Sequence, residues 1–284
     1  MTIKIVTDST CDLPPEVIKQ HGITIVPLYV HVDGKDFRDG IDLSRQEFYQ
    51  RLPEYNPPPT TAAPSPETFR QTYERLAAEG ATEILSMHIS VSLSSTVNEA
   101  RIAASETKQV PVTVFDSRQL SLGTGFLLIE AAKAATEGRS MKEILALLEA
   151  MIPRIFVAAA LDTLEFMRRS GRVSFALAGI GQILQIKPLL KMHDGHPTSE
   201  KVRTRAGAIR RLTQLLNKYA PVERIAFIYT SIRERVDELR NQVEALLPEG
   251  DMMVTELNPV LGAHVGPRVV GFVCVTKSQR LFIR

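Results

Sequence analysis

Short apolar runs alternate with longer segments of mixed polarity along the first half of the chain. Three runs are almost continuously apolar, which is typical of parallel strands covered on both faces: IKIVT (3–7), EILSMHI (83–89) and VTVFD (112–116). Helical patterns separate them, at 66–79, 96–107 and 120–137. This alternation predicts an α/β domain over residues 1–152, with a doubly wound, mostly parallel sheet.

The second half of the chain has a different pattern. Four strand-like runs occur, at 154–160, 223–230, 252–257 and 270–275. Helical patterns lie between them at 212–220 and 232–247. This order predicts a second, α+β domain over 153–284, which carries a mixed sheet with helices on one side. We place the domain boundary near 151–154.

Two segments interrupt the strand–helix rhythm of the first half. Residues 23–40 read as a strand with a hairpin turn near Asp33 and Gly34. Residues 53–66 (PEYNPPPTTAAPSP) form a proline-rich loop by composition. A long loop inside a compact domain is either functional or a plain surface crossover, and both interpretations stay open here.

Composition narrows the class of protein. The 284 residues carry a net charge of +2, which gives no general attraction for nucleic acid or for an anionic membrane. Two distant cysteines, Cys11 and Cys274, predict no disulfide framework and favour a reducing compartment. The N-terminus lacks the apolar core of a signal peptide, and no run reaches the length of a membrane span. We therefore expect a cytoplasmic protein without stable membrane insertion.

A turn rich in hydroxyl groups joins the run at 83–89 to the helical pattern that follows. It contains Ser92, Ser94, Ser95 and Thr96. Such side chains can cap the helix. They can also hold an anion or a carboxylate, because a helix N-terminus presents unpaired N–H groups and favours negative charge. The turn alone leaves both interpretations open.

A second polar group could share a crevice with this turn, and a third candidate is a histidine that could equally be a surface or core residue. Thr60, Thr61 and Ser65 lie in the proline-rich loop, and His264 lies in GAHVGP, ahead of a buried strand. Ligands of doubly wound sheets bind beyond the carboxyl ends of the strands, where the loop and the turn would meet. Glycines beside His264 would let the backbone approach a ligand closely.

Several kinds of chemistry find little support. No G-x-S-x-G elbow occurs, although Ser94, His264 and either Asp8 or Asp116 could in principle form a triad. The histidines lack metal-ligand spacing, and the glycine-rich nucleotide motifs are incomplete, so we expect neither a metal nor a cofactor. A series of basic residues is either a solvated face or a docking surface: Arg168, Arg169, Arg172, Lys191, Lys201, Arg203 and Arg205.

The order of these motifs resembles the DegV family of bacterial fatty-acid-binding proteins. The resemblance spans nearly the whole chain and rests on DST, TTAAPSP, ISVSLSST, FDS, LEFMRRSGRVS, IKPLL, KVRTRAGA and GAHVGP. It implies two α/β domains with a long-chain fatty acid between them, its carboxylate held by hydroxyls and a histidine. It also implies that the bound acid is presented to a separate fatty acid kinase subunit, which makes the acyl phosphate used in phospholipid synthesis.

The resemblance also assigns residues. It places the carboxylate ligands at Thr61, Ser94 and His264, and we add Ser95, the next hydroxyl of the same turn, to the predicted ligand-binding residues. It places partner-binding residues at Arg172, which follows Gly171, and in the R-T-R segment, at Arg203 and Arg205. The sequence departs from the family pattern at a few positions near these motifs: Ala62, Ala63, Val91, Ser95, Val97, Asn98 and Arg268.

The main hypothesis is a lipid-binding carrier that is not an enzyme and whose only bound group is the fatty acid. The alternative is a serine hydrolase or acyltransferase that uses Ser94 with His264 as the base. A DNA-binding regulator is suggested only by the basic residues, and no helix-turn-helix pattern accompanies them.

Overall fold

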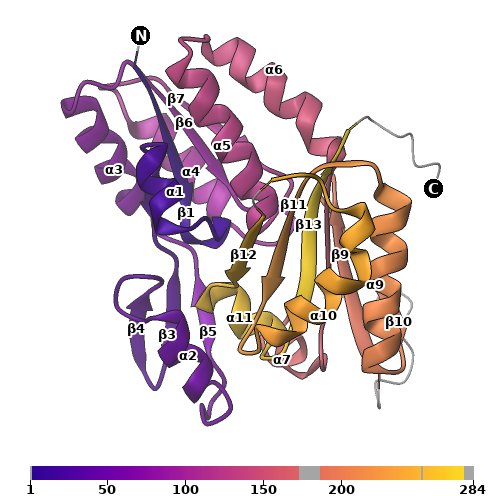
Figure 1. Ribbon diagram of the computed structural model, residues 1–284. Coiled ribbons are helices and arrows are strands. Elements are labelled where there is room, and N and C mark those ends of the chain that lie inside the picture. The colour runs from indigo at the N-terminus through magenta and orange to yellow at the C-terminus, as the bar shows by residue number, and fades with distance from the viewer. Residues whose placement is uncertain (1, 173–185, 251, 278–284) are drawn as a thin grey trace.

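The computed structural model describes residues 2–172, 186–250 and 252–277, which contain three β-sheets (Figure 1). The first is a parallel sheet in the strand order β2-β1-β6-β7. Its strands are β1 (Ile3–Asp8), β2 (Thr24–Val26), β6 (Glu83–His88) and β7 (Val112–Asp116). Both faces of β1 and β6 are largely buried, as their unbroken apolar runs predict.

Helices cover both faces of the parallel sheet. They are α1 (Pro15–Gln20), α3 (Pro66–Ala78), α4 (Thr96–Glu106), α5 (Leu122–Thr136) and α6 (Met141–Met151). Phe69 and Tyr73 of α3 pack under one face together with Ala100 of α4, whereas α5 packs on the other face. Among the described residues, no helix combines the length and apolarity that a bilayer crossing requires. The predicted doubly wound α/β unit is confirmed.

A small antiparallel sheet interrupts this unit, in the order β4-β3-β5. It consists of β3 (Tyr29–Val32), β4 (Lys35–Arg38) and β5 (Thr60–Ala62), and α2 (Arg45–Arg51) packs on it through Phe48. Asp33 and Gly34 form the predicted hairpin turn, both with positive φ angles. The prediction of a loop throughout 53–66 was wrong at β5, because three residues are too few to show strand periodicity.

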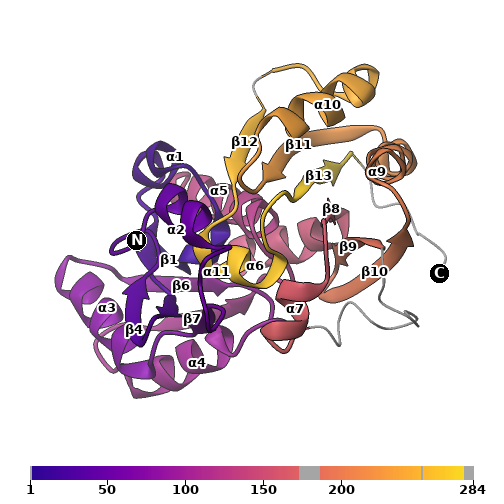
Figure 2. The same ribbon diagram turned by 90° about the horizontal axis from the view of Figure 1, so that it is seen from below.

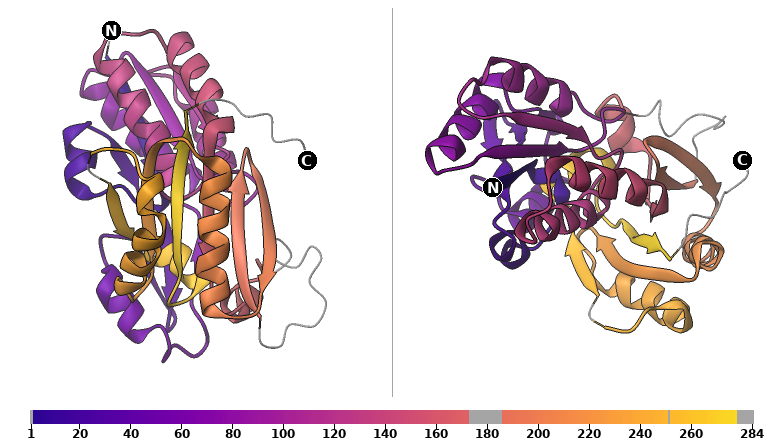
Figure 3. Two further views of the ribbon diagram at one scale, coloured as in Figure 1. Left: turned by 45° about the vertical axis from the view of Figure 1, so that its right-hand side comes forward. Right: turned by 90° about the horizontal axis from the view of Figure 1, so that it is seen from above.

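The third sheet is mixed, as predicted, in the order β10-β9-β8-β13-β11-β12, and only β11 and β12 run parallel. Its strands are β8 (Ile155–Ala160), β9 (Lys187–His193), β10 (His196–Val202), β11 (Val222–Tyr229), β12 (Met253–Glu256) and β13 (Val270–Thr276). Helices α9 (Arg205–Tyr219) and α10 (Glu234–Val243) lie together on one face (Figure 3). The β9–β10 hairpin was not predicted, because β10 (HPTSEKV) is a polar edge strand without apolar periodicity.

Alternate residues of β8 pack into two different hydrophobic cores, one on each face of the mixed sheet. Phe156 and Ala158 pack beneath α9, while Val157 and Ala159 face the parallel-sheet half and join its core around α5. One hydrophobic core therefore runs from one sheet to the other. The predicted boundary falls in a 3-10 turn (Ile152–Arg154) between α6 and β8, and the division into two domains there stays a prediction.

Candidate ligand-binding site

A cavity of about 310 Å³ lies between the parallel sheet, the mixed sheet and two short helices. These helices are α7 (Glu165–Arg169) and α11 (Pro259–Val265), and Figure 2 shows both between the two larger sheets. The cavity is lined mainly by aliphatic side chains, among them Leu28, Ile89, Leu93, Leu120, Val157, Leu161, Met167, Leu190, Met192, Ile228, Leu257, Val260, Leu261 and Val265. Its size and lining are typical of a site for a small apolar molecule.

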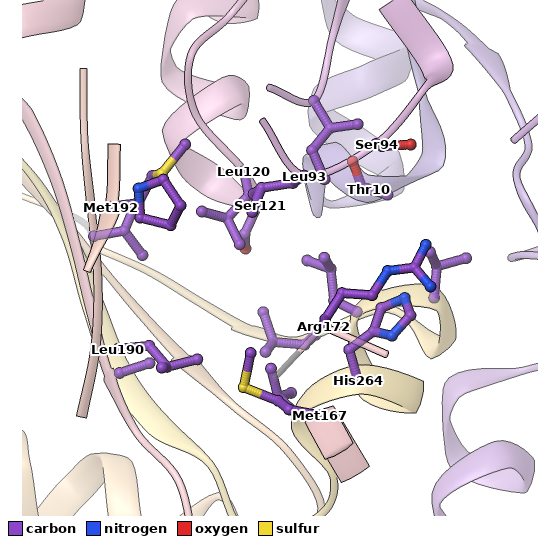
Figure 4. Close-up of a pocket in the computed structure, with 18 of the residues that line it drawn as sticks. Thr10, Leu93, Ser94, Leu120, Ser121, Met167, Arg172, Leu190, Met192 and His264 are labelled. Atoms are coloured by element: carbon purple, nitrogen blue, oxygen red, sulfur yellow. The ribbon is translucent and has the colours of Figure 1, made fainter. Parts of the chain in front are cut away.

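The mixed sheet forms one wall of this cavity. Ile228, Gly271, Ala159 and Leu190 lie opposite one another in four neighbouring strands and therefore share a face. The small side chain of Ala159 leaves room for a ligand, whereas Gly271 lets β13 approach the backbone of β8 closely. Leu190 and Met192 lie at the side of the cavity away from Ser94 and His264 (Figure 4).

His264 and Thr61 meet at the polar end of the cavity. Nε2 of His264 lies 3.0 Å from Oγ1 of Thr61, although the two residues are 203 positions apart. Burial, and after it the positive charge of Arg172, lowers the pKa of His264 from 6.5 to about 4. The imidazole is therefore neutral at pH 7. Its buried Nδ1 has no hydrogen-bond partner among the described residues, which indicates a place for a polar ligand group.

The hydroxyl turn (residues 90–96) borders the same end of the cavity. Ser94 Oγ lies 2.8 Å from Thr96 Oγ1 and accepts a hydrogen bond from the Thr96 N–H at 3.3 Å. Ser95 occupies the N-cap position of α4, but within the described structure its side chain makes no capping hydrogen bond. Capping therefore accounts for Ser94 in part and does not account for Ser95. Both serines line the cavity beside a helix N-terminus, which favours negative charge.

The three arginines predicted to bind a partner do not lie together. Arg172 lines the cavity, and its guanidinium donates a hydrogen bond to the Ser170 carbonyl at 2.8 Å. Arg203 and Arg205 are exposed on either side of Thr204, the N-cap of α9, and do not line this cavity. The structure thus places Arg172 where it can contact a ligand in the cavity, which was not predicted. Partner binding stays a prediction for all three.

Asp8, one of the acids considered for a catalytic triad, is paired with a different histidine. Its Oδ2 lies 3.1 Å from Nδ1 of His88, whose Nε2 lies 2.7 Å from Ser86 Oγ. Burial raises the pKa of Asp8, but the hydrogen bond and the charge of His88 outweigh it and lower the pKa overall. All three side chains are buried, and Tyr73 closes the chain at 2.7 Å from Ser86. None of these four side chains lines the cavity, although Asp8 accepts a hydrogen bond from Thr10, which does.

The predicted Ser94–His264 pair gains no support from the geometry. In the described residues, the side-chain hydrogen bonds of Ser94 go to Thr96, and that of His264 goes to Thr61. A nucleophile and its base would need a direct hydrogen bond or a path to one. The described residues contain no group of three or more His, Cys, Asp or Glu side chains that could hold a metal ion.

The GAHVGP segment differs from its prediction. Its first four residues, 262–265, form the C-terminal part of α11. A Cβ atom on Gly262 would lie 2.3 Å from the Tyr49 hydroxyl, and one on Gly266 would lie 2.2 Å from the Phe166 ring. These glycines therefore let the backbone approach two aromatic side chains of the protein, whereas we had expected them to approach a ligand.

Thr10 and Ser121 are among the residues that border the cavity without having been predicted there. Thr10 donates its hydroxyl to Asp8 at 2.5 Å, and Ser121 donates its hydroxyl to Asp12 at 2.6 Å. Both are buried just behind the cavity surface. Asp8 is the N-cap of the 3-10 turn and accepts a hydrogen bond from the Thr10 N–H, whereas no sequence signal marks Ser121.

The fold and the cavity together define a class of α/β proteins in which a parallel and a mixed sheet enclose one amphipathic cavity. The chain belongs to the DegV family, as the match of the family model (described as an uncharacterised protein, DegV family) over residues 2–277 shows.

Relatives and solved structures agree with this assignment. A DegV domain-containing protein of Streptomyces coelicolor is 37% identical over 279 residues, which cover 95% of this chain and 97% of that protein. A fatty-acid-binding DegV family protein from Thermus thermophilus has 36% identity and a TM-score of 0.89, with 97% and 100% of the two chains covered. DegV of Bacillus subtilis, a fatty-acid-binding protein, has 31% identity and a TM-score of 0.88 over 97% and 100%.

Proposed function

We propose that this protein binds one long-chain fatty acid in the cavity and works as a cytoplasmic carrier. In this proposal Thr61, Ser94, Ser95 and His264 hold the carboxylate, and the acyl chain lies along the apolar wall. The observation that carries the proposal is the amphipathic cavity, at one end of which several hydroxyls gather with a neutral histidine whose Nδ1 lacks a partner in the described part of the chain. The fatty-acid-binding relatives described above support it.

The two ends of the cavity would contribute differently to affinity. Each methylene that leaves water contributes about 0.8 kcal/mol, so a chain of some 16 carbons supplies at most ~10 kcal/mol before ordering costs. Hydrogen bonds to a charged carboxylate add about 1.5 to 3 kcal/mol each. The chain would therefore supply most of the affinity, and the polar end would set the orientation.

Native mass spectrometry of the purified protein tests this proposal. A bound mass that matches a long-chain fatty acid is expected, and it should disappear after delipidation and return after palmitate is added. A delipidated protein that takes up neither palmitate nor oleate would exclude the proposed function.

Replacement of Thr61 by valine is expected to raise the Kd for palmitate about tenfold. The substitution keeps the shape of the side chain but removes a hydroxyl that contacts His264, and one such hydrogen bond contributes about 1.5 kcal/mol. Thr60→Val is the matched control, because Thr60 is exposed on the same strand and does not line the cavity. Equal affinities of the two variants, measured by calorimetry, would place the carboxylate elsewhere.

We further propose that the carrier performs no chemistry alone and presents the bound acid to a separate fatty acid kinase subunit, which forms the acyl phosphate. Support comes from the family resemblance and from the separation of Ser94 and His264 into different hydrogen-bonded pairs. The exposed Arg203 and Arg205 beside the N-terminus of α9 offer positive charge to an acidic surface of the partner.

Arg203→Glu is expected to reduce acyl phosphate formation at least tenfold in a reaction with a purified kinase subunit, ATP and palmitate-loaded protein. The Kd for palmitate should not change, because Arg203 lies outside the cavity. Arg240→Glu, an exposed charge reversal on α10, serves as the control. If the two variants support the same rate, the docking surface does not include Arg203.

A further inference from the structure

One buried carboxylate connects three elements that wall the cavity. Asp12, which is 1% exposed, follows the 3-10 turn after β1. Its carboxylate accepts hydrogen bonds from Ser121 Oγ at 2.6 Å and from the N and Nδ2 atoms of Asn258 at 2.9 Å each. Arg45 of α2 lies 3.3 Å away. Segments that are more than one hundred positions apart in the sequence therefore converge on a single side chain.

Asn258 carries this contact directly to the polar end of the cavity. It is the N-cap of α11, and its Oδ1 accepts a hydrogen bond from the Leu261 N–H at 2.9 Å. His264 lies six residues further along, about 9 Å at the rise of an α-helix. Leu261 and His264 both line the cavity. The position of the N-cap thus sets where the imidazole lies.

The backbone on the opposite side of Asp12 is strained. Ser121 has φ 51° and ψ −141°, a conformation that is rare outside glycine and that costs about 1–3 kcal/mol. Asp12 itself has φ 55°. Position 121 holds serine although glycine would relieve the strain. The hydroxyl that glycine lacks is the one that donates to Asp12.

The burial of Asp12 is also unfavourable in itself. Burial raises its pKa even though Arg45, Ser121 and Asn258 all act to lower it. An apolar contact could hold the same segments together without burying a charge. A carboxylate with directed hydrogen bonds to two elements, by contrast, fixes their relative position as well as their proximity.

We propose that Asp12 is a positioning residue: through Asn258 it holds α11, and with it His264, in register with α5 and the hydroxyl turn. This arrangement makes the site select an acid head group over an uncharged one of the same chain length. The inference rests on the proposed fatty acid binding and assigns to Asp12 and Ser121 the head-group selectivity of that site.

The test compares palmitic acid with 1-hexadecanol, which has the same chain but no carboxylate. Both are measured by displacement of a fluorescent long-chain fatty acid. The wild-type protein is expected to prefer the acid at least tenfold. Asp12→Asn should reduce this preference at least fivefold while the Kd for 1-hexadecanol stays within twofold. A purely structural role would weaken both ligands alike.

A reciprocal exchange provides the rescue. In the double variant Asp12→Asn/Asn258→Asp, the new carboxylate can still cap Leu261 and accept a hydrogen bond from the new amide. The acid preference should return to within twofold of the wild-type value. Asp42→Asn is the control, because Asp42 is bound to Arg38 on the surface of the antiparallel sheet, away from this group.

Ser121→Gly is the second variant, and its preference for the acid over the alcohol tests the proposal even if Asp12→Asn does not fold. It relieves the backbone strain, so the melting temperature should be kept while the acid preference falls. An unchanged preference in Asp12→Asn or in Ser121→Gly, or an equal loss for both ligands, would overturn the positioning role. A wild-type protein that binds neither ligand would instead refute the proposed function itself.

Discussion

Replacing Ala159 with phenylalanine is expected to weaken palmitate binding by roughly 100-fold or more. Ala159 lies in the middle of the wall that β11, β13, β8 and β9 form, and its side chain faces the cavity. The ring adds six carbon atoms to the space where we place the acyl chain. Displacing four methylenes would cost about 3 kcal/mol, which corresponds to the stated change in Kd.

Fatty acids of different chain length distinguish a blocked cavity from a general loss of structure. The row that contains Ala159 ends at Leu190, on the side of the cavity away from Ser94 and His264 (Figure 4). The affinity for octanoate, which reaches less far from the polar end, should therefore change much less than the affinity for palmitate. Ala78→Phe, on the exposed end of α3, controls for the added ring. Unchanged palmitate affinity in Ala159→Phe would show that the chain does not lie along this wall.

Asp39→Asn is expected to stabilise the protein increasingly as the pH rises. Asp39 is 3% exposed, and its Oδ2 has no hydrogen-bond partner among the described residues. Burial raises the pKa of Asp39 to about 7; a hydrogen bond from Ser9 opposes this effect, and the neighbouring charge of Asp12 reinforces it. The folded protein therefore holds a proton that the unfolded chain releases near pH 4.

The sign of the pH dependence follows from this difference. Between about pH 4 and pH 7 the folded state binds more protons at Asp39 than the unfolded state does, so the free energy of unfolding falls as the pH rises. From pH 5 to pH 8 this loss amounts to about 3 kcal/mol, and Asp39→Asn should remove it. Denaturant titrations of both proteins at several pH values measure the difference.

Asp42→Asn, in the same loop, is the control for this pH dependence. A hydrogen bond from Arg38 lowers the pKa of Asp42 to about 2. Both its folded and its unfolded pKa therefore lie below pH 5, and this variant should keep the wild-type slope between pH 5 and pH 8. If the free energy of unfolding of Asp39→Asn changed with pH as that of the wild type does, Asp39 would already be ionised in the folded protein.

The larger part of the fold could be predicted from periodicity alone. Continuously buried strands such as β1 and β6 have a clear apolar signature, and α3 has a serine N-cap followed by Pro66. The β9–β10 hairpin and β5 have no such signature. β5 is three residues long, and β10 lies at the edge of its sheet, where polar side chains are tolerated on both faces.

The candidate site was predictable in its residue types and less so in its arrangement. Thr61, Ser94, Ser95 and His264 were identified from their motifs, and the structure brings all four to one cavity. Arg172 was assigned to a partner, because a sequence cannot show whether an arginine points outward or into a cavity. The contacts of Asp12 depend on φ angles and on residues 109 and 246 positions away, which no local pattern records.

The place of β13 in its sheet bears on how the protein matures. β13 pairs with β8 on one side and with β11 on the other, so it occupies the interior of the sheet although it is the most distal strand of the described chain. During translation, the edges of β8 and β11 that pair with β13 stay unpaired until residue 276 has left the ribosome. The cavity can thus close only after β13 has been synthesised, and a nascent chain stalled before β13 should not bind palmitate.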